Sequence, residues 1–161
     1  MSLIIRQATA EDVPLILQLV TELAIYEKAE FEVLATEEHY HKTLFCENAK
    51  AFALIAEIDN IPVGYAIYFY SFSTWLGKYG IYLEDLYVRQ QRRGEGAGKA
   101  LLKELAKIAV NNDCGRVEWS VLDWNEPSIQ FYKALGAEPK DGWTTYRLDG
   151  DALAEFGSDK T

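Results

Sequence analysis

The pattern of hydrophobic and polar positions changes its period several times along the chain. Residues 2–7 fit a short strand, and Thr9 with Asp12 three positions later is a helix start signal. From Val13 onward, apolar side chains recur at helical spacing. This pattern predicts an amphipathic helix that ends near Tyr26.

A second helix and three strands are expected next. A polar loop at 27–35 leads to a helix at 36–45, which opens with a threonine followed by acidic residues. Residues 51–57 and 62–70 are β-prone, and the Asp-Asn pair between them favours a hairpin turn. A third strand is expected at 81–88, directly after two glycines.

The second half begins with a glycine-rich segment at 91–98, followed by a helix in which Leu101, Leu105 and Ile108 share one stripe. The remaining expected elements are a strand at 116–122, a short helix at 125–135, a last strand at 143–148 and a helical stretch at 151–156. This order of elements predicts a mixed α/β fold in a single domain, residues 1–161.

Composition narrows the class of protein. The chain has 161 residues, 49% of them hydrophobic and 25% charged, which is typical of a globular protein. No apolar run reaches membrane-spanning length, and the apolar start before Arg6 is too short for a signal peptide, so we expect a cytoplasmic protein. The formal net charge of −9 disfavours nucleic acid or an anionic membrane as a partner and favours a cationic substrate.

The segment QRRGEGAG, residues 91–98, lies between a strand and a helix, where backbone N–H groups and the helix N-terminus can bind a phosphate. A P-loop is disfavoured because Gly94 and Gly98 are one residue too close and Ala100 replaces the hydroxyl residue. A dinucleotide fingerprint is disfavoured because the third glycine falls at Gly98, with Lys99 in its expected place. A glycine-rich turn without a ligand remains an alternative on the loop alone.

Gln91, Gly94 and Gly96 match the pattern Q/R-x-x-G-x-G/A, and the chain resembles the GNAT acyltransferases in this loop and in its order of elements. Further segments resemble the diamine branch of that family, the spermidine/spermine and thialysine N-acetyltransferases: LAIYE at 23–27, YLED at 82–85, WNEPS at 124–128 and GW at 142–143. The resemblance implies a mostly antiparallel sheet flanked by helices, acetyl-CoA as the acetyl donor, and a homodimer.

The resemblance also implies which residues contact the donor. The pantetheine arm would meet Leu86, Tyr87 and Val88, and the pyrophosphate would meet the loop. The loop residues concerned are Arg92, Arg93, Gly94, Glu95, Gly96, Ala97, Gly98 and Lys99, and the later residues that border the donor are Asn125, Glu126, Pro127 and Ser128.

Transfer to an amine needs a base, because an alkyl ammonium with a pKa near ~10 is protonated at neutral pH. Glu84 is the first choice and Asp85 the second, since strand alternation would place them on opposite faces, with one facing inward. Tyr132 is the expected acid for the thiolate, because Asn125, Ser128 and Tyr132 share one helix face. Each of these side chains could instead be structural.

For the acceptor, the resemblance nominates Tyr26, Glu27, Glu84, Glu118, Trp119, Ser120 and Asp141. Carboxylates at such positions would suit a small diamine, polyamine or thialysine-like amine. Cys46 and Cys114 have no nearby histidine, so direct transfer in a ternary complex is preferred over an acetyl-cysteine route, and no metal site is expected. The rival functions are acetylation of another amine (an amino acid, an antibiotic or a peptide N-terminus) and non-catalytic acyl-CoA sensing.

Overall fold

The apolar alternating segments of the first half form one sheet. In the computed structural model, which describes residues 1–159, five strands lie in chain order. They are antiparallel neighbours except for the last two, which run parallel. The strands are β1 (Leu3–Gln7), β2 (Ala51–Ile58), β3 (Ile61–Ser73), β4 (Lys78–Val88) and β5 (Val117–Trp119).

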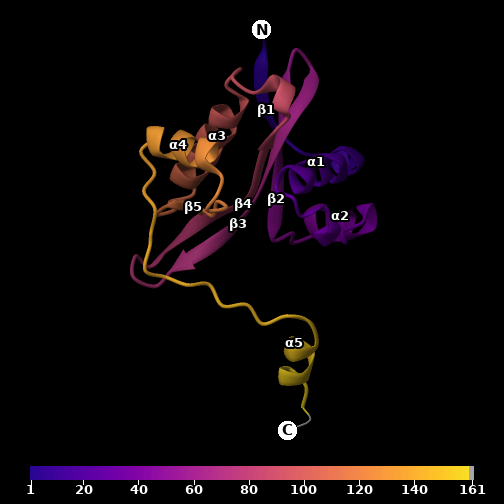
Figure 1. The fold of residues 1–161 in the computed structure, drawn as a ribbon, viewed down its shortest axis with the longest axis vertical. Helices are drawn as coiled ribbons and strands as arrows, with labels where there is room; N and C mark the ends of the chain where they lie inside the picture. Colours follow the sequence, from indigo (N-terminus) through magenta and orange to yellow (C-terminus); the bar gives the residue numbers. More distant parts are fainter. Residues whose placement is uncertain (160–161) are drawn as a thin grey trace. The chain divides into compact units, whose positions relative to one another are not determined.

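Helices cover both faces of this sheet (Figure 1). α1 (Val13–Tyr26) and α2 (Glu37–Leu44) lie on one face, and α3 (Ala97–Asn111) lies on the other. Ile16 and Leu19 of α1 pack with Ile55 and Tyr65 of the strands in a core from which water is excluded. The expected mixed α/β architecture with a mostly antiparallel sheet is confirmed.

Local sequence signals explain how two of these elements begin. The Thr9 amide donates to the Asp12 carboxylate at 2.8 Å, and Arg6 donates to the same carboxylate through two nitrogens, at 2.8 and 2.9 Å. The expected hairpin turn is also confirmed, because Asp59 and Asn60 both have positive φ, 50° and 67°.

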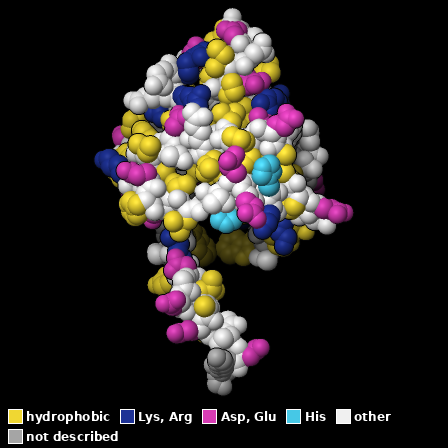
Figure 2. Space-filling view, turned by 90° about the vertical axis from the view of Figure 1, so that its right-hand side faces the viewer, with side chains coloured by type: hydrophobic (Ala, Val, Ile, Leu, Met, Phe, Trp, Pro, Cys, Tyr) yellow, Lys and Arg dark blue, Asp and Glu magenta, His cyan; other side chains and the backbone are white. Residues whose placement is uncertain are grey.

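The face formed by α1 and α2 carries acidic, basic and hydrophobic side chains in a mixed pattern (Figure 2). The two histidines of the chain, His39 and His41, both belong to α2 and mark it in this view. The negative net charge is therefore not gathered as one patch on this face.

The chain divides into two units, Met1–Ser120 and a second that begins at Val121. The second unit contains α4 (Glu126–Ala134) and α5 (Gly150–Phe156), as expected from the sequence. The expected strand at 143–148 is wrong, because this segment has no strand partner and its Trp143 and Tyr146 are 81% and 93% exposed. β-Propensity alone does not form a strand when no neighbouring strand accepts its hydrogen bonds.

Candidate functional site

The parallel strands β4 and β5 separate soon after they meet. Their pairing runs from Ile81 opposite Val117 to Leu83 opposite Trp119, and β4 then continues to Val88 beside β3. The edge of β4 that β5 no longer pairs includes Leu86, Tyr87 and Val88. Its backbone can bind an extended ligand arm, because successive N–H and C=O groups lie along one line.

The glycine-rich loop follows this edge directly. Gly94 and Gly96 have φ of 87° and 92°, which only glycine adopts readily, and a Cβ added at Gly94 would meet no atom within 4 Å. The first helical hydrogen bond of α3 runs from the Ala100 amide to the Gly96 carbonyl at 3.0 Å. The preceding N–H groups of the first turn therefore have no acceptor within the helix, which makes this loop a suitable anion site.

Two arginines of the loop have different neighbours. Arg92 donates to the Glu95 carboxylate at 2.7 Å, within the loop itself. Arg93 donates to the Val88 carbonyl at 3.0 Å, and its guanidinium lies 4.7 Å from the centre of the Tyr26 ring. Arg93 therefore connects the expected donor loop to the end of α1.

A β-bulge lies where the two candidate bases are found. Tyr68 pairs with Leu83, but Ile67, the preceding residue of β3, pairs with Asp85, so that Glu84 is the extra residue. Asp85 therefore lies on the same face as Ile67, the face covered by α1 and α2. The bulge shifts the alternation of β4 by one residue, so Asp85 lies on the face opposite to that of Leu83.

Asp85 is half-buried, whereas Glu84 is exposed. The Tyr65 hydroxyl donates to the Asp85 Oδ2 at 2.9 Å. Burial, together with the charge of Glu84, raises the pKa of the Asp85 carboxyl, while the hydrogen bond from Tyr65 lowers it. The expectation that one of these carboxylates faces inward therefore applies to Asp85.

Glu27 and Tyr40 lie near enough to Asp85 for its charge to influence both. Burial and the Asp85 charge raise the pKa of Glu27, which caps α1, and both also raise the pKa of Tyr40 in α2. We name Glu27, Tyr40, Tyr65 and Asp85 the acidic cluster. Two carboxylates whose charged forms are disfavoured in this way would be stabilised by a cation.

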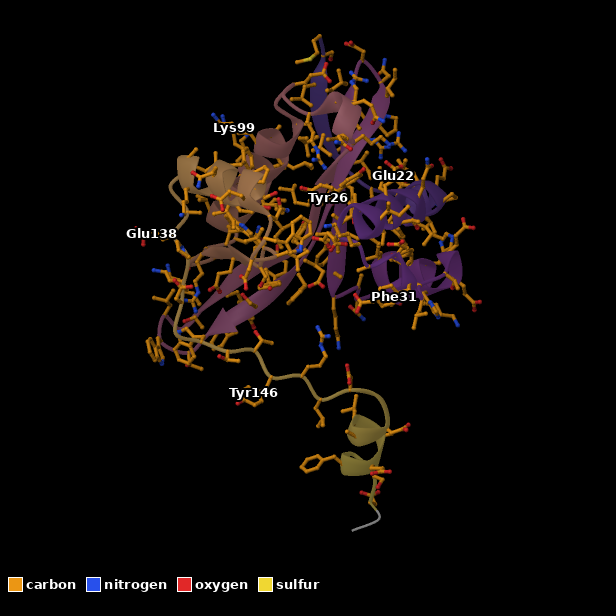
Figure 3. All side chains as sticks on the ribbon, viewed as in Figure 1. Glu22, Tyr26, Phe31, Lys99, Glu138 and Tyr146 are labelled. Atoms are coloured by element: carbon orange, nitrogen blue, oxygen red, sulfur yellow. The ribbon has the colours of Figure 1, made fainter. Side chains whose placement is uncertain are left out.

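Tyr26 is the last residue of α1 and packs against the core, and Glu22 lies one turn earlier in the same helix (Figure 3). Glu22 accepts from the Tyr87 hydroxyl at 3.3 Å and forms an ion pair with Arg89 at 3.1 Å. These contacts tie α1 to the end of β4, next to the glycine loop.

The acceptor residues expected on β5 lie at its end. Glu118 forms an ion pair with Arg116 at 3.2 Å, and Ser120 exchanges a hydrogen bond of 2.8 Å with the Tyr82 hydroxyl. Glu118 and Trp119 are half-buried. Since Glu118 already has a cationic partner, it is less suited to binding a substrate ammonium than Asp85 is.

The remaining expected site residues belong to the second unit. The Asn125 side chain caps α4 by accepting from the Ser128 amide at 3.4 Å, with Glu126 and Pro127 in the first turn. Tyr132 lies two turns from this cap and is half-buried, and Asp141 is exposed in the segment that follows α4.

Sequence reasoning missed Tyr40 and Tyr65. Tyr65 lies in an apolar strand with the pattern of a core residue, and only the register of β3 with β4 reveals the bulged Asp85 beside it. No local signal in the sequence distinguishes this tyrosine from the other aromatic residues of β3.

The cysteines are not arranged for an alternative, covalent chemistry. Cys46 is exposed, and partial burial together with Asp113 raises the pKa of the Cys114 thiol, which disfavours a reactive thiolate. Within residues 1–159, no group of His, Cys, Asp and Glu side chains is arranged to hold a metal ion. Nor does that part of the chain contain a helix of the length and hydropathy needed to span a membrane.

Comparisons with known proteins agree with this geometry. A family model described as the acetyltransferase (GNAT) family matches residues 20–137. The chain is 39% identical to the thialysine N-epsilon-acetyltransferase of Bos taurus, over 94% of this chain and 95% of that protein. It is 34% identical to the spermidine/spermine N(1)-acetyltransferase-like protein 1 of Homo sapiens, over 94% of this chain and 23% of that protein. Among solved structures, an integron cassette protein from the mobile metagenome of V. cholerae superposes with a TM-score of 0.81 at 26% identity, covering 97% of this chain and 98% of that one.

Proposed function

Because this chain belongs to the GNAT acetyltransferase family, we infer that it moves the acetyl group of acetyl-CoA to a primary amine of a small, cationic molecule. The observation that carries the choice of acceptor is the acidic cluster, in which Asp85 and Glu27 are half-buried close together. A cation bound there would neutralise charges that burial disfavours.

Features of the first unit support a donor site at β4 and the glycine loop. The edge of β4 past Leu83 offers unpaired backbone to the pantetheine arm, and Gly94, Gly96 and the first turn of α3 offer N–H groups to the pyrophosphate. Acetyl-CoA supplies an activated thioester, and the cofactor-side residues expected from the sequence, Leu86–Val88, Arg92–Lys99 and Asn125–Ser128, would hold it.

The proposed reaction is direct transfer within a ternary complex. Glu84 takes a proton from the reacting ammonium, directly or through water, and its exposure lets it release that proton to solvent. The neutral nitrogen then forms the new N–C bond as the C–S bond breaks. Tyr132 donates a proton to the departing sulfur, and the nitrogen loses its second proton to solvent, from which Tyr132 is reprotonated, so that a neutral amide and a neutral thiol result.

The acceptor end is assigned to residues that can bind a second cation. Asp85 and Glu27 pair with the distal ammonium, and Tyr26 borders the same end of α1. Glu118, Trp119, Ser120 and Asp141 are proposed to complete the acceptor site. The named activities of the relatives, on thialysine and on spermidine or spermine, involve amines that carry such a second cation.

The test is an initial-rate assay of the chain with acetyl-CoA and a panel of thialysine, lysine, spermidine and putrescine. We expect at least one member to yield a mono-acetylated product by mass spectrometry, with one thiol released per acetyl group. Binding of acetyl-CoA with no acetylation of any amine would instead identify a sensor, and transfer only to an amine without a second cationic group, such as a neutral peptide N-terminus, would overturn the acceptor class.

A further inference from the structure

Tyr65 carries a hydroxyl in a position where the core needs only an aromatic ring. Its side chain has no exposed surface and packs with Ile16, Leu19 and Ile55. A phenylalanine would fill nearly the same space, whereas a buried hydroxyl needs a hydrogen-bond partner to avoid a desolvation cost. Here that partner is the Asp85 Oδ2, at 2.9 Å.

The other titratable groups that influence Asp85 are acidic, so they do not fix its carboxylate by opposite charge. Glu84 on the same strand, Glu27 at the end of α1 and Tyr40 on α2 face it with acidic groups. Within the described part of the chain, none of the ion pairs of 4 Å or less includes Asp85. A carboxylate in such surroundings tends to take up a proton or turn toward water unless a donor fixes it.

We propose that Tyr65 is a positioning residue of the acceptor site, whose hydroxyl holds the Asp85 carboxylate in place and thereby selects acceptors with a second ammonium group. The inference rests on the proposed function, because it requires Asp85 to bind the acceptor. Tyr65 acts through Asp85 and does not itself contact the reacting atoms.

This role has a consequence for pH dependence. The hydrogen bond from Tyr65 lowers the pKa of Asp85, whereas burial and Glu84 raise it. Without the hydroxyl, the pKa of Asp85 rises further, so Asp85 is neutral over a wider range of acidic pH. Binding of a diamine needs the charged carboxylate. As pH is lowered, this binding is therefore lost at a higher pH than in the wild type.

The test compares Tyr65→Phe with Tyr68→Phe, a matched control. Tyr68 is also buried in β3, but it pairs with Leu83 and lies on the opposite face of the sheet. For Tyr65→Phe we expect the KM of a diamine to rise roughly tenfold, as is typical for loss of a hydrogen bond to a charged group. We expect kcat, the KM for acetyl-CoA and the KM for a monoamine to stay within about twofold of the wild type, since one hydrogen bond at the distal end does not change the reacting groups.

The acid limb of the pH profile of kcat/KM for the diamine should move to higher pH in Tyr65→Phe and not in Tyr68→Phe. Equal effects of the two substitutions, or an unchanged acid limb, would overturn the inference. Tyr65→Phe should add nothing in an Asp85→Asn background, because the hydroxyl acts through that carboxylate.

Two further variants separate this inference from the proposed function. If Asp85→Asn leaves the diamine KM unchanged, the acceptor role of Asp85 is wrong, and the role of Tyr65 falls with it. If Asp85→Asn raises this KM but Tyr65→Phe does not, only the role of Tyr65 is overturned. Should Tyr65→Phe not fold, Asp85→Glu tests position alone: it keeps the charge but displaces it from the hydroxyl, so a wild-type KM would contradict the inference.

Discussion

Asp85, the residue that we propose to bind the acceptor, has a cost to the fold. Because its folded pKa is raised above that of an unfolded chain, its charged form is disfavoured in the folded state. The contribution of Asp85 to stability is therefore most favourable while the residue is protonated and declines as pH rises through the pKa of its carboxyl. Residues that oppose stability in this way are common at binding sites.

Asp85→Asn is accordingly expected to increase the free energy of unfolding at pH 7 by about 1 kcal/mol, since it removes a disfavoured charge and keeps an oxygen that accepts from Tyr65. At pH 3, where the aspartate is protonated in both states, the variant and the wild type should be equally stable. Urea titrations at the two pH values measure this, and destabilisation at pH 7 would argue against a disfavoured charge.

Asp12 has a lowered pKa, in contrast to Asp85. Hydrogen bonds from Arg6 lower its pKa, so the stability that it adds is present above the unfolded pKa and is lost as pH falls through the folded one. Asp12→Asn should cost about 1–2 kcal/mol at pH 7 and little at pH 2. Thermal melts across this range, with the exposed Asp159→Asn as control, would contradict the expectation if the loss did not depend on pH.

Tyr132 is the residue on which the proposed acid step depends. Tyr132→Phe should lower kcat by about 100-fold or more, as loss of a general acid does, with little change in the affinity for acetyl-CoA. Rates measured above and below neutral pH with a good acceptor check this. Full retention of kcat would remove the assignment, and Tyr146→Phe, a 93% exposed tyrosine of the same unit, is the control.

At the scale of elements, a bulge and a strand separation define the site. β4 is no longer paired with β5 after Leu83, and the bulge adds one residue to β4 at Glu84. Unpaired backbone is therefore available next to the two carboxylates. The glycine loop and the first turn of α3 follow directly, which brings anion-binding groups to the end of the same strand.

Alanine substitutions at two glycines can distinguish the effect of backbone strain on stability from an effect on acetyl-CoA binding. Gly94 and Gly77 both have positive φ, and a Cβ at either would meet no atom within 4 Å. Alanine at either position should cost about 1–2 kcal/mol of stability, but only Gly94→Ala should raise the KM for acetyl-CoA, roughly tenfold. Equal KM values in the two variants would contradict a donor role for the loop.

The sequence predicted elements whose signal is local. The amphipathic stripes of α1 and α3, the Asp59-Asn60 turn and the glycine loop all appear where their patterns indicate. The bulge at Glu84 and the extended segment at 143–148 were not predictable in this way, because a bulge depends on the register with β3 and a strand depends on a partner. The role of Tyr65 was missed for the same reason.

At the scale of the whole molecule, the residues with proposed catalytic or binding roles come from both units of the chain. Glu84 and the glycine loop belong to Met1–Ser120, whereas Tyr132 and Asp141 belong to the unit that begins at Val121. Trp143, Tyr146 and Phe156 of the second unit are at least 80% exposed. Large exposed aromatic side chains are a common feature of association surfaces.

We therefore expect a homodimer in solution. Sedimentation equilibrium should give twice the 18.3 kDa of the chain, and substitution of Trp143 and Tyr146 by serine should shift the protein toward the monomer. A monomer at micromolar concentration in the unsubstituted protein would contradict this expectation.

The central claim is that the chain transfers acetyl groups to an amine whose second cation binds the acidic cluster. Its most direct test is the kcat/KM for cadaverine against that for pentylamine, two acceptors with the same five-carbon chain that differ in the distal ammonium. We expect cadaverine to be preferred by about tenfold or more, with the preference lost in Asp85→Asn. Equal values for the two amines, or no acetylation of either, would contradict the account.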